Sequence, residues 1–485
     1  MGLKIIIVGG SISGLSLANM LERFDIEYIL LERHSIIAPQ LGASIGLLPS
    51  GLRILDQLGC YEKIRKAAGD VYYRTSMRLF SGKTWTDTQP VSFSQQLEDR
   101  LGYPQIFIDR KTLLHVLFDK LMFKDRVLTN KMVVTVDLSG EHVTVHTQDG
   151  AVYSGDIVVG ADGVHSAIRS EMWRLSQESR SGLFKADAID GLQSESKCIF
   201  GISKRPAGLT GNAIQVNSFF KSCNYMMLSA PDSRLYWFLF TSLDRTCGKS
   251  IPKFTKEDER ALAENHFDDQ VTETTTFGEI YAHRLHSTLV ALEDHVFPQW
   301  HFRRIITIGD AAHKVHPISA QGGNGAMETA AVLVNTLRRR MANQTSKENL
   351  NEDDIESVFA EVQAKRFSRV EDAVNQGCRT TAASIKETFF SRLFVDYFFP
   401  RFGQSLIWSL VIKNTETGPT IDDIPIPARY EKAIIRHRET TNKRSWSFWS
   451  LVTLGPCILT LLAYSTISWT WSTQPMNIYS MDLRT

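Results

Sequence analysis

The sequence predicts an α/β fold with two domains (α+β), whose segments interleave along the chain. C-terminal helices and a C-terminal membrane segment are expected to follow. Residues 4–32 have the pattern of a strand, a helix and a strand, and such a βαβ unit predicts a parallel sheet. Residues 72–80 and 213–243 are rich in aromatic and β-branched side chains and are divided by turns, which predicts an antiparallel sheet. A long uncharged stretch near the C-terminus predicts the membrane segment.

The composition is that of a globular protein. The 485 residues include 54 basic and 53 acidic side chains, so the net charge is +1. At about 100–200 residues per domain, this length allows more than one domain. Hydrophobic residues make up 43% and charged residues 22%, which excludes a disordered, collagen-like or many-span membrane protein. Because phosphate binding needs a basic surface, we expect no nucleic-acid partner.

The N-terminal unit starts with the apolar run Ile5–Val8, which is typical of a strand buried on both faces. Gly9 and Gly10 end this run, a mostly apolar helix follows, and Tyr28–Leu31 forms a second apolar strand. Further along the chain, the pattern predicts a hairpin meander that returns to a buried strand, another short strand and two helical stretches, at residues 133–163, 305–308, 326–341 and 355–412.

The C-terminal stretch has no charged residue from Ser445 to Met481. Residues 448–468 are long enough to span a bilayer at about 20 residues per span, and two tryptophans flank each side. Basic residues precede the stretch, which places the main body in the cytosol by the positive-inside rule. We therefore expect a membrane anchor over residues 446–472 and a location at the endoplasmic reticulum membrane. A buried C-terminal helix is the alternative.

The first motif is the glycine-rich turn between the first strand and the first helix, with Gly9, Ser11 and Gly14. Such a turn brings backbone N–H groups and a helix N-terminus close to a pyrophosphate. Ser11 stands where the usual pattern has glycine, but its side chain is small. Glu32 follows at the end of the next strand, where a carboxylate accepts hydrogen bonds from ribose hydroxyls. The sequence therefore predicts dinucleotide binding, and an ordinary tight turn is the alternative.

Two later motifs carry carboxylates and glycines at the ends of predicted strands and at the start of a helix. Asp162 lies in GADGVHSAIR, and Asp310 follows a strand in GDAAH, where it could hold a polyol hydroxyl. Gly322 and Gly323 open a helix and can present N–H groups to an anionic or carbonyl-bearing ring. An Asp-Gly pair alone is more often a simple turn.

Taken together, GGSISG, Glu32, DGVHSAIR and GDAAHKVHP with QGGNGA resemble the single-component FAD-dependent monooxygenases of the aromatic-hydroxylase type, over roughly residues 4–345. The segments 42–64 and 108–110 resemble a narrower group, the fungal FAD-dependent epoxidases of indole-diterpene and meroterpenoid biosynthesis. The resemblance implies a discontinuous Rossmann-like FAD-binding domain, a substrate-binding β-sheet domain, a helical region and the anchor. We expect these parts at residues 1–71, 106–185 and 282–345; 72–105 and 186–281; 346–445; and 446–472.

The resemblance also implies FAD and NADPH as cofactors and O2 as the oxidant. Arg110 is suited to a pyrophosphate because a guanidinium can bind it bidentately, although an ion pair with Asp109 or Glu98 is the alternative. Ala320 stands where the wider family often has glycine. The motif of Asp162 would serve FAD and NAD(P)H. The positions implied to contact FAD are Glu32, Gly46, Arg110, Asp310 and Gly323.

The predicted substrate sheet is rich in aromatic residues and methionine, which suits a prenyl chain. Alternation assigns only about half of these side chains to the substrate face, and packing is the alternative for each. Tyr225 is the candidate catalytic residue, as a hydrogen-bond donor to a peroxide or epoxide oxygen. No CxxC motif and no Cys/His set with zinc spacing occurs, so no metal site is predicted and the cysteines are expected to be reduced.

The leading hypothesis is epoxidation of a terminal alkene in a prenylated meroterpenoid or diterpenoid precursor, with membrane lipid nearby and a terpene cyclase acting next. One alternative is a phenol hydroxylase that acts on a soluble polyketide. A flavin halogenase is disfavoured because the WxWxIP string is missing. A non-catalytic prenyl-binding carrier is an alternative of another class, but it would not need the Asp162 and Asp310 motifs. The exact substrate, the choice between NADPH and NADH and the oligomeric state stay open.

Overall fold

The computed structural model describes residues 3–39, 44–184, 191–211, 213–343, 350–385 and 387–444. The chain forms two compact units, Met1–Ala433 and Ile434–Thr485. The two largest sheets and every candidate site residue that the sequence predicts lie in the first unit.

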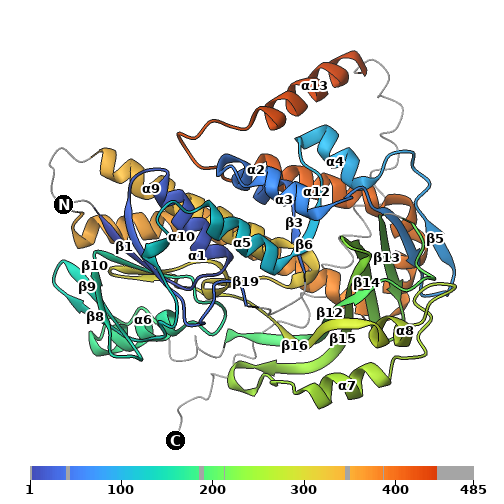
Figure 1. Cartoon of the computed structure of the whole chain (residues 1–485), viewed down its shortest axis with the longest axis horizontal. Helices are drawn as coiled ribbons and strands as arrows, with labels where there is room; N and C mark the ends of the chain where they lie inside the picture. The colour runs from blue at the N-terminus through green and yellow to red at the C-terminus, as the bar shows by residue number, and fades with distance from the viewer. Residues whose placement is uncertain are drawn as a thin grey trace, which may run out of the picture. The chain divides into compact units, whose positions relative to one another are not determined.

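The parallel sheet that the N-terminal unit predicts is present (Figure 1). Ile5 and Ile7 pack in one apolar cluster while Ile6 and Val8 pack in another, so both faces are buried and the run is continuously apolar. One pairing in this sheet is antiparallel, that of the two strands latest in the sequence, which form a hairpin over residues 301–307. The order is β17 (His301–Phe302), β18 (Ile305–Thr307), β11 (Ile157–Gly160), β1 (Lys4–Val8), β2 (Glu27–Leu31) and β7 (Val127–Leu128).

Helices cover this sheet and bring three chain segments to its carboxyl edge. Helix α1 (Ile12–Glu22) follows β1 and packs against α9 (Gln321–Ala342) and α5 (Arg110–Lys120). Helix α6 (Ala167–Glu178) follows β11 and packs against that strand. A two-stranded ladder of β3 (Ser44–Leu47) and β6 (Ile106–Asp109) reaches the start of α9. The predicted meander is confirmed as β8 (Val133–Ser139), β9 (His142–Thr147) and β10 (Val152–Gly155).

The second sheet is eight-stranded and mainly antiparallel, as predicted, with one parallel pairing between β13 and β4. Its strand β16 begins at Arg284, inside the range 282–345 that the prediction gave to the other domain. The order is β19 (His313–Lys314), β16 (Arg284–Val296), β12 (Gln193–Lys204), β15 (Arg234–Cys247), β14 (Cys223–Ala230), β13 (Ile214–Phe219), β4 (Arg74–Arg78) and β5 (Thr84–Thr86).

The two faces of this sheet have different neighbours, because successive side chains on a strand point to opposite sides. The inner face shares an apolar cluster with β1 and α9, and its members include Cys198, Ile202, Leu228, Tyr236, Phe238 and Phe240. The outer face packs with α7 (Lys256–Glu264) and α8 (Phe277–Ala282), and its members include Ile199, Tyr225, Met227, Leu235, Trp237 and Leu239.

Within the described residues, the stretch from 352 to 444 is mainly helical, as predicted. Its first helix packs on α9 through an ion pair between Arg366 and Glu328, at 2.7 Å with both side chains 2% exposed. The helices are α10 (Glu352–Ile385), α11 (Phe389–Leu393), η6 (Phe394–Gly403), α12 (Gln404–Glu416) and α13 (Ala428–Arg444). Three shorter helices, α2 (Pro49–Gln57), α3 (Tyr61–Ala68) and α4 (Phe93–Leu101), lie earlier in the chain.

The membrane location predicted from the sequence is corrected. Within the described ranges, the structure contains no helix whose length and apolar character would let it cross a bilayer. The predicted anchor, residues 446–472, lies outside the described residues.

Candidate functional site

The glycine turn after β1 has a geometry that larger side chains would block. Gly9 has φ +109°, and a Cβ there would lie 2.4 Å from the carbonyl oxygen of Ala161. A Cβ on Gly14 would lie 2.0 Å from the carbonyl oxygen of Gly9. Ser11 is extended and begins α1, so the tight turn is kept although glycine is replaced. The turn therefore lies directly against the loop that follows β11.

Glu32 fixes the next edge of the site. It is 8% exposed, and its Oε2 accepts a 2.6 Å hydrogen bond from the Gly10 N–H. Its Oε1 accepts from the His34 N–H at 2.9 Å and lies 2.6 Å from the His34 Nδ1. The carboxylate is thus held at the end of β2, beside the glycine turn, where the sequence predicts a ribose contact.

Arg110 reaches the same turn from the first residue of α5. Its guanidinium donates a 2.7 Å hydrogen bond to the Ser11 Oγ. Burial lowers the pKa of Arg110, and the nearby carboxylates of Asp310 and Glu32 act against that shift. Across the described ranges, no carboxylate comes within ion-pair distance of Arg110. A partly buried cation without an acidic partner is suited to a phosphate.

The alternative partners that the sequence offered for Arg110 bind elsewhere. Asp109 accepts two hydrogen bonds from Arg234, at 3.1 and 3.0 Å. Glu98 accepts from the hydroxyl of Tyr72. The surface ion pair considered for Arg110 is therefore wrong.

Asp310 lies in the loop after β18, next to the start of α1. Gly309, with φ +60°, is so close that a Cβ would lie 2.2 Å from the Ser13 Oγ. The Asp310 Oδ2 accepts a 2.5 Å hydrogen bond from the Lys314 Nζ. Lys314 was not predicted as a site residue, because it lies in the short strand β19 rather than in an α-helix, so its spacing of four from Asp310 gave no signal.

The start of α9 closes the site. A Cβ on Gly323 would lie 2.6 Å from the Ile45 Cδ1, and one on Gly46 would lie 2.9 Å from the Ala320 Cβ, so β3 packs closely on this turn. Ala320 has φ +54°, a region that favours glycine, so this departure from the wider family keeps a left-handed turn. A Cβ on Gly322 would meet only the Asp310 Oδ1, at 4.0 Å, so the helix N-terminus is open there.

Asn324 is a second residue that the sequence reasoning missed. Its amide nitrogen donates to the carbonyl of Gly46 at 3.1 Å, and its Oδ1 accepts from the N–H of Leu48 at 3.1 Å. This pair of bonds ties α9 to the end of β3. No local pattern could reveal it, because the partners are more than 270 residues apart.

Asp162 organises its own loop. Its carboxylate accepts hydrogen bonds from the Ser166 hydroxyl at 2.6 Å and the Ile168 N–H at 3.2 Å. Burial raises the pKa of Asp162, and these bonds act against the shift. Arg169 then donates to the Ala311 carbonyl at 2.8 Å, which joins this loop to the one that carries Asp310. Asp162 therefore supports the site through its neighbours.

Tyr225, the predicted catalytic residue, is not brought together with these residues. It lies on the outer face of the antiparallel sheet, 1% exposed, in the cluster with Trp237 and Phe277. Its hydroxyl donates to the Asp269 Oδ2 at 2.6 Å. The alternation of side chains along the strands predicted that the sheet has two faces. It did not predict which face lies toward the FAD-binding domain. This position does not support a catalytic role for Tyr225.

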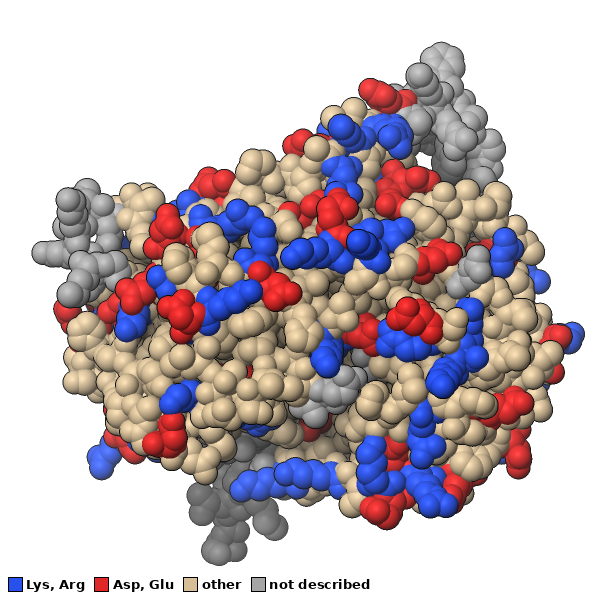
Figure 2. All heavy atoms as spheres, in the orientation of Figure 1, with Lys and Arg blue, Asp and Glu red and all other residues tan. Residues whose placement is uncertain are grey.

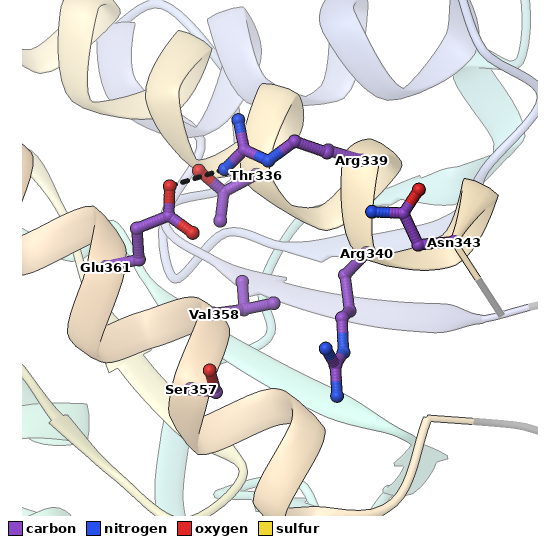
Figure 3. A pocket seen from close by; sticks show the side chains of 7 residues that line it. All are labelled: Thr336, Arg339, Arg340, Asn343, Ser357, Val358 and Glu361. Atoms are coloured by element: carbon purple, nitrogen blue, oxygen red, sulfur yellow. Dashed lines mark hydrogen bonds and ion pairs between the residues drawn. The ribbon is translucent and has the colours of Figure 1, made fainter.

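Hollows on the surface lie apart from most of these residues. One of 110 Å³ lies between α9 and α10, where Arg339 pairs with Glu361 (Figure 3). Another, of 330 Å³, is lined by Arg33 next to Glu32 and by four other residues: Asn130, Met132, Gln148 and Asp149. On the face shown in Figure 2, basic and acidic side chains are intermixed, without a field of one sign.

The converging residues fit FAD. Arg110 lies beside a glycine turn and pairs with no carboxylate among the residues that the structure describes, which suits it to the pyrophosphate. Glu32 at the end of β2 is placed for a ribose, and Asp310 for the ribityl hydroxyls. The open N-terminus at Gly322 can stabilise the negative charge of the reduced ring.

Comparisons with known proteins agree with this fit. A family model described as an FAD binding domain matches residues 2–360. The FAD-dependent monooxygenase penE of Penicillium thymicola is 33% identical over 471 residues, which cover 97% of each chain. The FAD-dependent monooxygenase spyC of Aspergillus fumigatus is 38% identical over 405 residues, covering 83% of this chain and 84% of spyC.

Solved structures share the fold. A variant of Klebsiella pneumoniae HpxO in complex with FAD has a TM-score of 0.66 and 22% identity, with 86% of this chain and 99% of HpxO covered. CtdE in complex with FAD and a substrate has a TM-score of 0.60 and 16% identity, with 92% and 100% covered. With the family model spanning most of the sequence and the relatives aligned nearly end to end, the chain belongs to the FAD-dependent monooxygenases that carry this FAD-binding domain.

Proposed function

We propose that this FAD-dependent monooxygenase is an epoxidase of fungal secondary metabolism. It would oxygenate a terminal alkene of a prenylated meroterpenoid or diterpenoid precursor, with NADPH as the source of electrons. The epoxide would then be a substrate for a terpene cyclase. The observation that carries the proposal is the apolar inner face of the antiparallel sheet.

The inner face offers aromatic and aliphatic side chains toward the cofactor domain. Leu228, Phe238 and Phe240 are at most 5% exposed and share a cluster with β1 and α9. The rings of Phe238 and Phe240 stack with centroids 6.0 Å apart, and Phe200 meets Phe238 edge to face at 5.4 Å. An isolated alkene needs proximity and exclusion of water rather than a base, and an apolar wall would favour the exclusion of water.

The residues of the cofactor site would each have one task. When bound, reduced FAD would activate O2 and supply one oxygen atom to the alkene, while the other leaves as water. Arg110 would bind the pyrophosphate, and Glu32 would hold ribose hydroxyls. Asp310 would hold the ribityl chain, with Lys314 keeping its carboxylate in place. The N–H of Gly322 would favour negative charge on the ring.

His316, next to this region, is not placed as a base. Its Nε2 lies 3.1 Å from the Ser196 Oγ, and its Nδ1 lies 3.1 Å from the Thr381 Oγ1. Burial, together with the charge of Lys314, lowers the pKa of His316 to about 3, so the ring is neutral at neutral pH. Both nitrogens are engaged by hydroxyls, which supports a site built for an unactivated alkene.

A phenol hydroxylase is the second candidate, and Tyr236 is the observation that favours it. Tyr236 is fully buried on the inner face. Burial, and to a smaller extent the negative charge of Asp109, raises the pKa of Tyr236, so its hydroxyl stays protonated. A protonated phenol there could donate a hydrogen bond to a substrate oxygen. The non-catalytic carrier is not retained, because the chain belongs to a family of monooxygenases.

The test is turnover by the FAD-loaded full chain with NADPH and O2. We expect farnesylated or geranylgeranylated aromatic compounds to gain one oxygen atom, detected by mass spectrometry, and small phenols to remain unchanged. Phe238→Ala on the inner face should raise KM for the prenylated substrate at least tenfold, whereas Phe277→Ala, an equally large truncation on the outer face, should not. Release of hydrogen peroxide alone with every prenylated compound would refute the epoxidase, and turnover of phenols alone would support the hydroxylase.

A further inference from the structure

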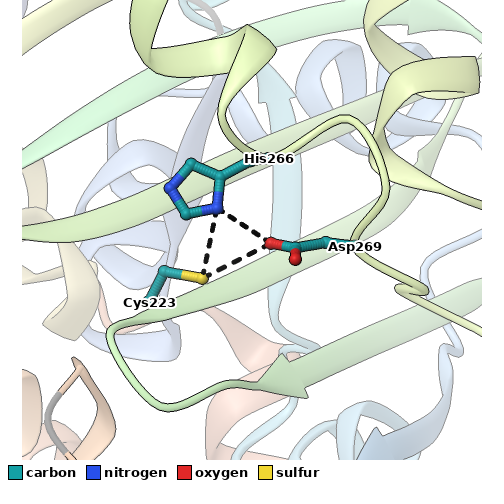
Figure 4. Close-up of side chains that lie close together, drawn as sticks. All are labelled: Cys223, His266 and Asp269. Atoms are coloured by element: carbon teal, nitrogen blue, oxygen red, sulfur yellow. Dashed lines mark hydrogen bonds and ion pairs between the residues drawn. The ribbon is translucent and has the colours of Figure 1, made fainter.

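A second cluster of reactive side chains lies on the outer face, where the cofactor chemistry does not use it (Figure 4). Cys223 begins β14, while His266 and Asp269 come from the segment between α7 and α8. The Cys223 Sγ lies 3.8 Å from the His266 Nδ1 and 3.7 Å from the Asp269 Oδ2. The His266 Nδ1 lies 2.9 Å from the same Asp269 oxygen. Three different ligand types therefore point toward one another.

These distances suit a tetrahedral divalent ion. Zinc binds sulfur at about 2.3 Å and nitrogen or oxygen at about 2.0–2.2 Å, so ligand atoms around it lie roughly 3.4–3.6 Å apart. The two distances to sulfur already lie within a few tenths of an ångström of that range. The distance between His266 and Asp269 needs to widen by about half an ångström. Small side-chain rotations are enough for this change.

The charges and the exposure also suit a zinc ion. A thiolate from Cys223, a carboxylate from Asp269 and a neutral His266 would balance the two positive charges of Zn²⁺. The side chains of His266 and Asp269 are 16% and 25% exposed, so water can reach the cluster and complete the coordination. Cys223 itself is 1% exposed, so its sulfur lies at the inner end of the cluster.

A supporting shell is present. The Tyr225 hydroxyl donates to the Asp269 Oδ2, as partners of ligating carboxylates commonly do. The ring of Tyr225 is fixed by Phe220 and Phe277, at centroid distances of 5.5 and 5.2 Å. The sequence predicted Tyr225 as a catalytic residue, but its contacts suit it to hold the Asp269 carboxylate in place.

We propose that Cys223, His266 and Asp269 form a zinc site that ties β14 to the segment between α7 and α8, with Tyr225 as a positioning residue for Asp269. On binding, the Cys223 thiol loses its proton to water, the proton of the His266 Nδ1 moves to the Nε2 through solvent, and sulfur–zinc and nitrogen–zinc bonds form, with no change in oxidation state. The sequence spacing did not reveal the site, because Cys223 lies 43 residues before His266. The site is independent of the oxygenation chemistry, since it lies on the opposite face of the sheet.

The test uses cobalt as a spectroscopic probe on the FAD-loaded full chain after chelation and dialysis. We expect about one Co²⁺ per chain, with the d–d absorption of a tetrahedral, thiolate-bound cobalt ion at wavelengths longer than the flavin bands, and displacement of the cobalt by Zn²⁺. Cys223→Ser should abolish that absorption, whereas Cys247→Ser, at an exposed cysteine, should leave it unchanged. Tyr225→Phe should weaken Co²⁺ binding about tenfold and keep the absorption.

Flavin content and the circular dichroism of each variant show whether it is folded. If Cys223→Ser does not fold, His266→Gln and Asp269→Asn provide the same comparison. A wild-type chain that binds no stoichiometric Co²⁺, or absorption that persists in Cys223→Ser, would overturn the proposal and leave the cluster as a hydrogen-bond network.

Discussion

At the scale of single residues, the site depends on a few side chains that hydrogen bonds hold in place. Arg110 illustrates this, because a hydrogen bond to Ser11 holds its guanidinium beside the glycine turn, and no carboxylate in the described part of the chain pairs with it. A charged hydrogen bond is worth about 1.5–3 kcal/mol, so losing one weakens binding by about tenfold to a hundredfold. Arg110 is therefore the residue whose removal should affect the cofactor most directly.

We predict that Arg110→Gln weakens FAD binding by about tenfold to a hundredfold, because the pyrophosphate loses its cationic partner. The measurement is titration of the apoprotein with FAD, followed by flavin fluorescence. Arg174→Gln is a matched control, since Arg174 pairs with Glu171 and Glu178 on the surface of α6. Equal affinities for the two variants would show that Arg110 does not contact the cofactor.

At the scale of elements, α9 and α10 are joined by a buried charge cluster. Glu328 accepts from Arg366 at 2.7 Å and from Arg369 at 2.8 Å, and its side chain is 2% exposed. Burial acts against ionisation, but the two guanidinium groups hold the pKa of Glu328 below its usual range. Because α9 also starts at the cofactor site, the cluster fixes the helix that presents Gly322 and Gly323.

The depressed pKa of Glu328 predicts a pH dependence of stability. A carboxylate with a lowered folded-state pKa contributes stability above its unfolded pKa and loses it as the pH falls through the folded value. We expect the free energy of unfolding of the wild type to decrease as the pH falls below about 4.5. Glu328→Gln should be about 3–5 kcal/mol less stable at pH 7 and should lack this contribution in acid. Denaturant unfolding at several pH values measures the free energy of unfolding of the wild type and of Glu328→Gln. If this free energy changes with pH in the same way in both proteins, Glu328 is not the source of the pH dependence.

The elements show which parts of the fold could be predicted from the sequence. Continuous apolar strands followed by glycine or a carboxylate identified the parallel sheet and its carboxyl edge, because burial on both faces and close approach to a ligand demand those residues. The face of Tyr225 could not be predicted, since period-two alternation is symmetric. The place of strand β16 in the antiparallel sheet could not be predicted either, because its partner strand β12 begins at Gln193, far away in the chain.

At the scale of the whole molecule, the site is assembled from segments between Gly9 and Gly323, and strands of the antiparallel sheet alternate with these segments along the sequence. Binding of FAD therefore holds distant parts of the first unit together. A ligand that binds only the folded state adds stability that grows with the logarithm of its concentration.

We predict that removing FAD lowers the free energy of unfolding of the whole first unit. At an FAD concentration about one hundred times Kd, the difference is about 2.7 kcal/mol. Thermal unfolding of apoprotein and holoprotein, followed by circular dichroism and by tryptophan fluorescence, gives the measurement. Unfolding of the antiparallel sheet at the same temperature with and without FAD would contradict a shared stabilisation.

The bond between Asn324 and Gly46 has a consequence for biosynthesis. The turn after β1 leaves the ribosome early, but the helix start that completes the flavin cradle follows about three hundred residues later. A nascent chain therefore has no finished cradle while most of the antiparallel sheet is being translated. Capture of the cofactor becomes a late step, which follows the emergence of α9 rather than the first βαβ unit.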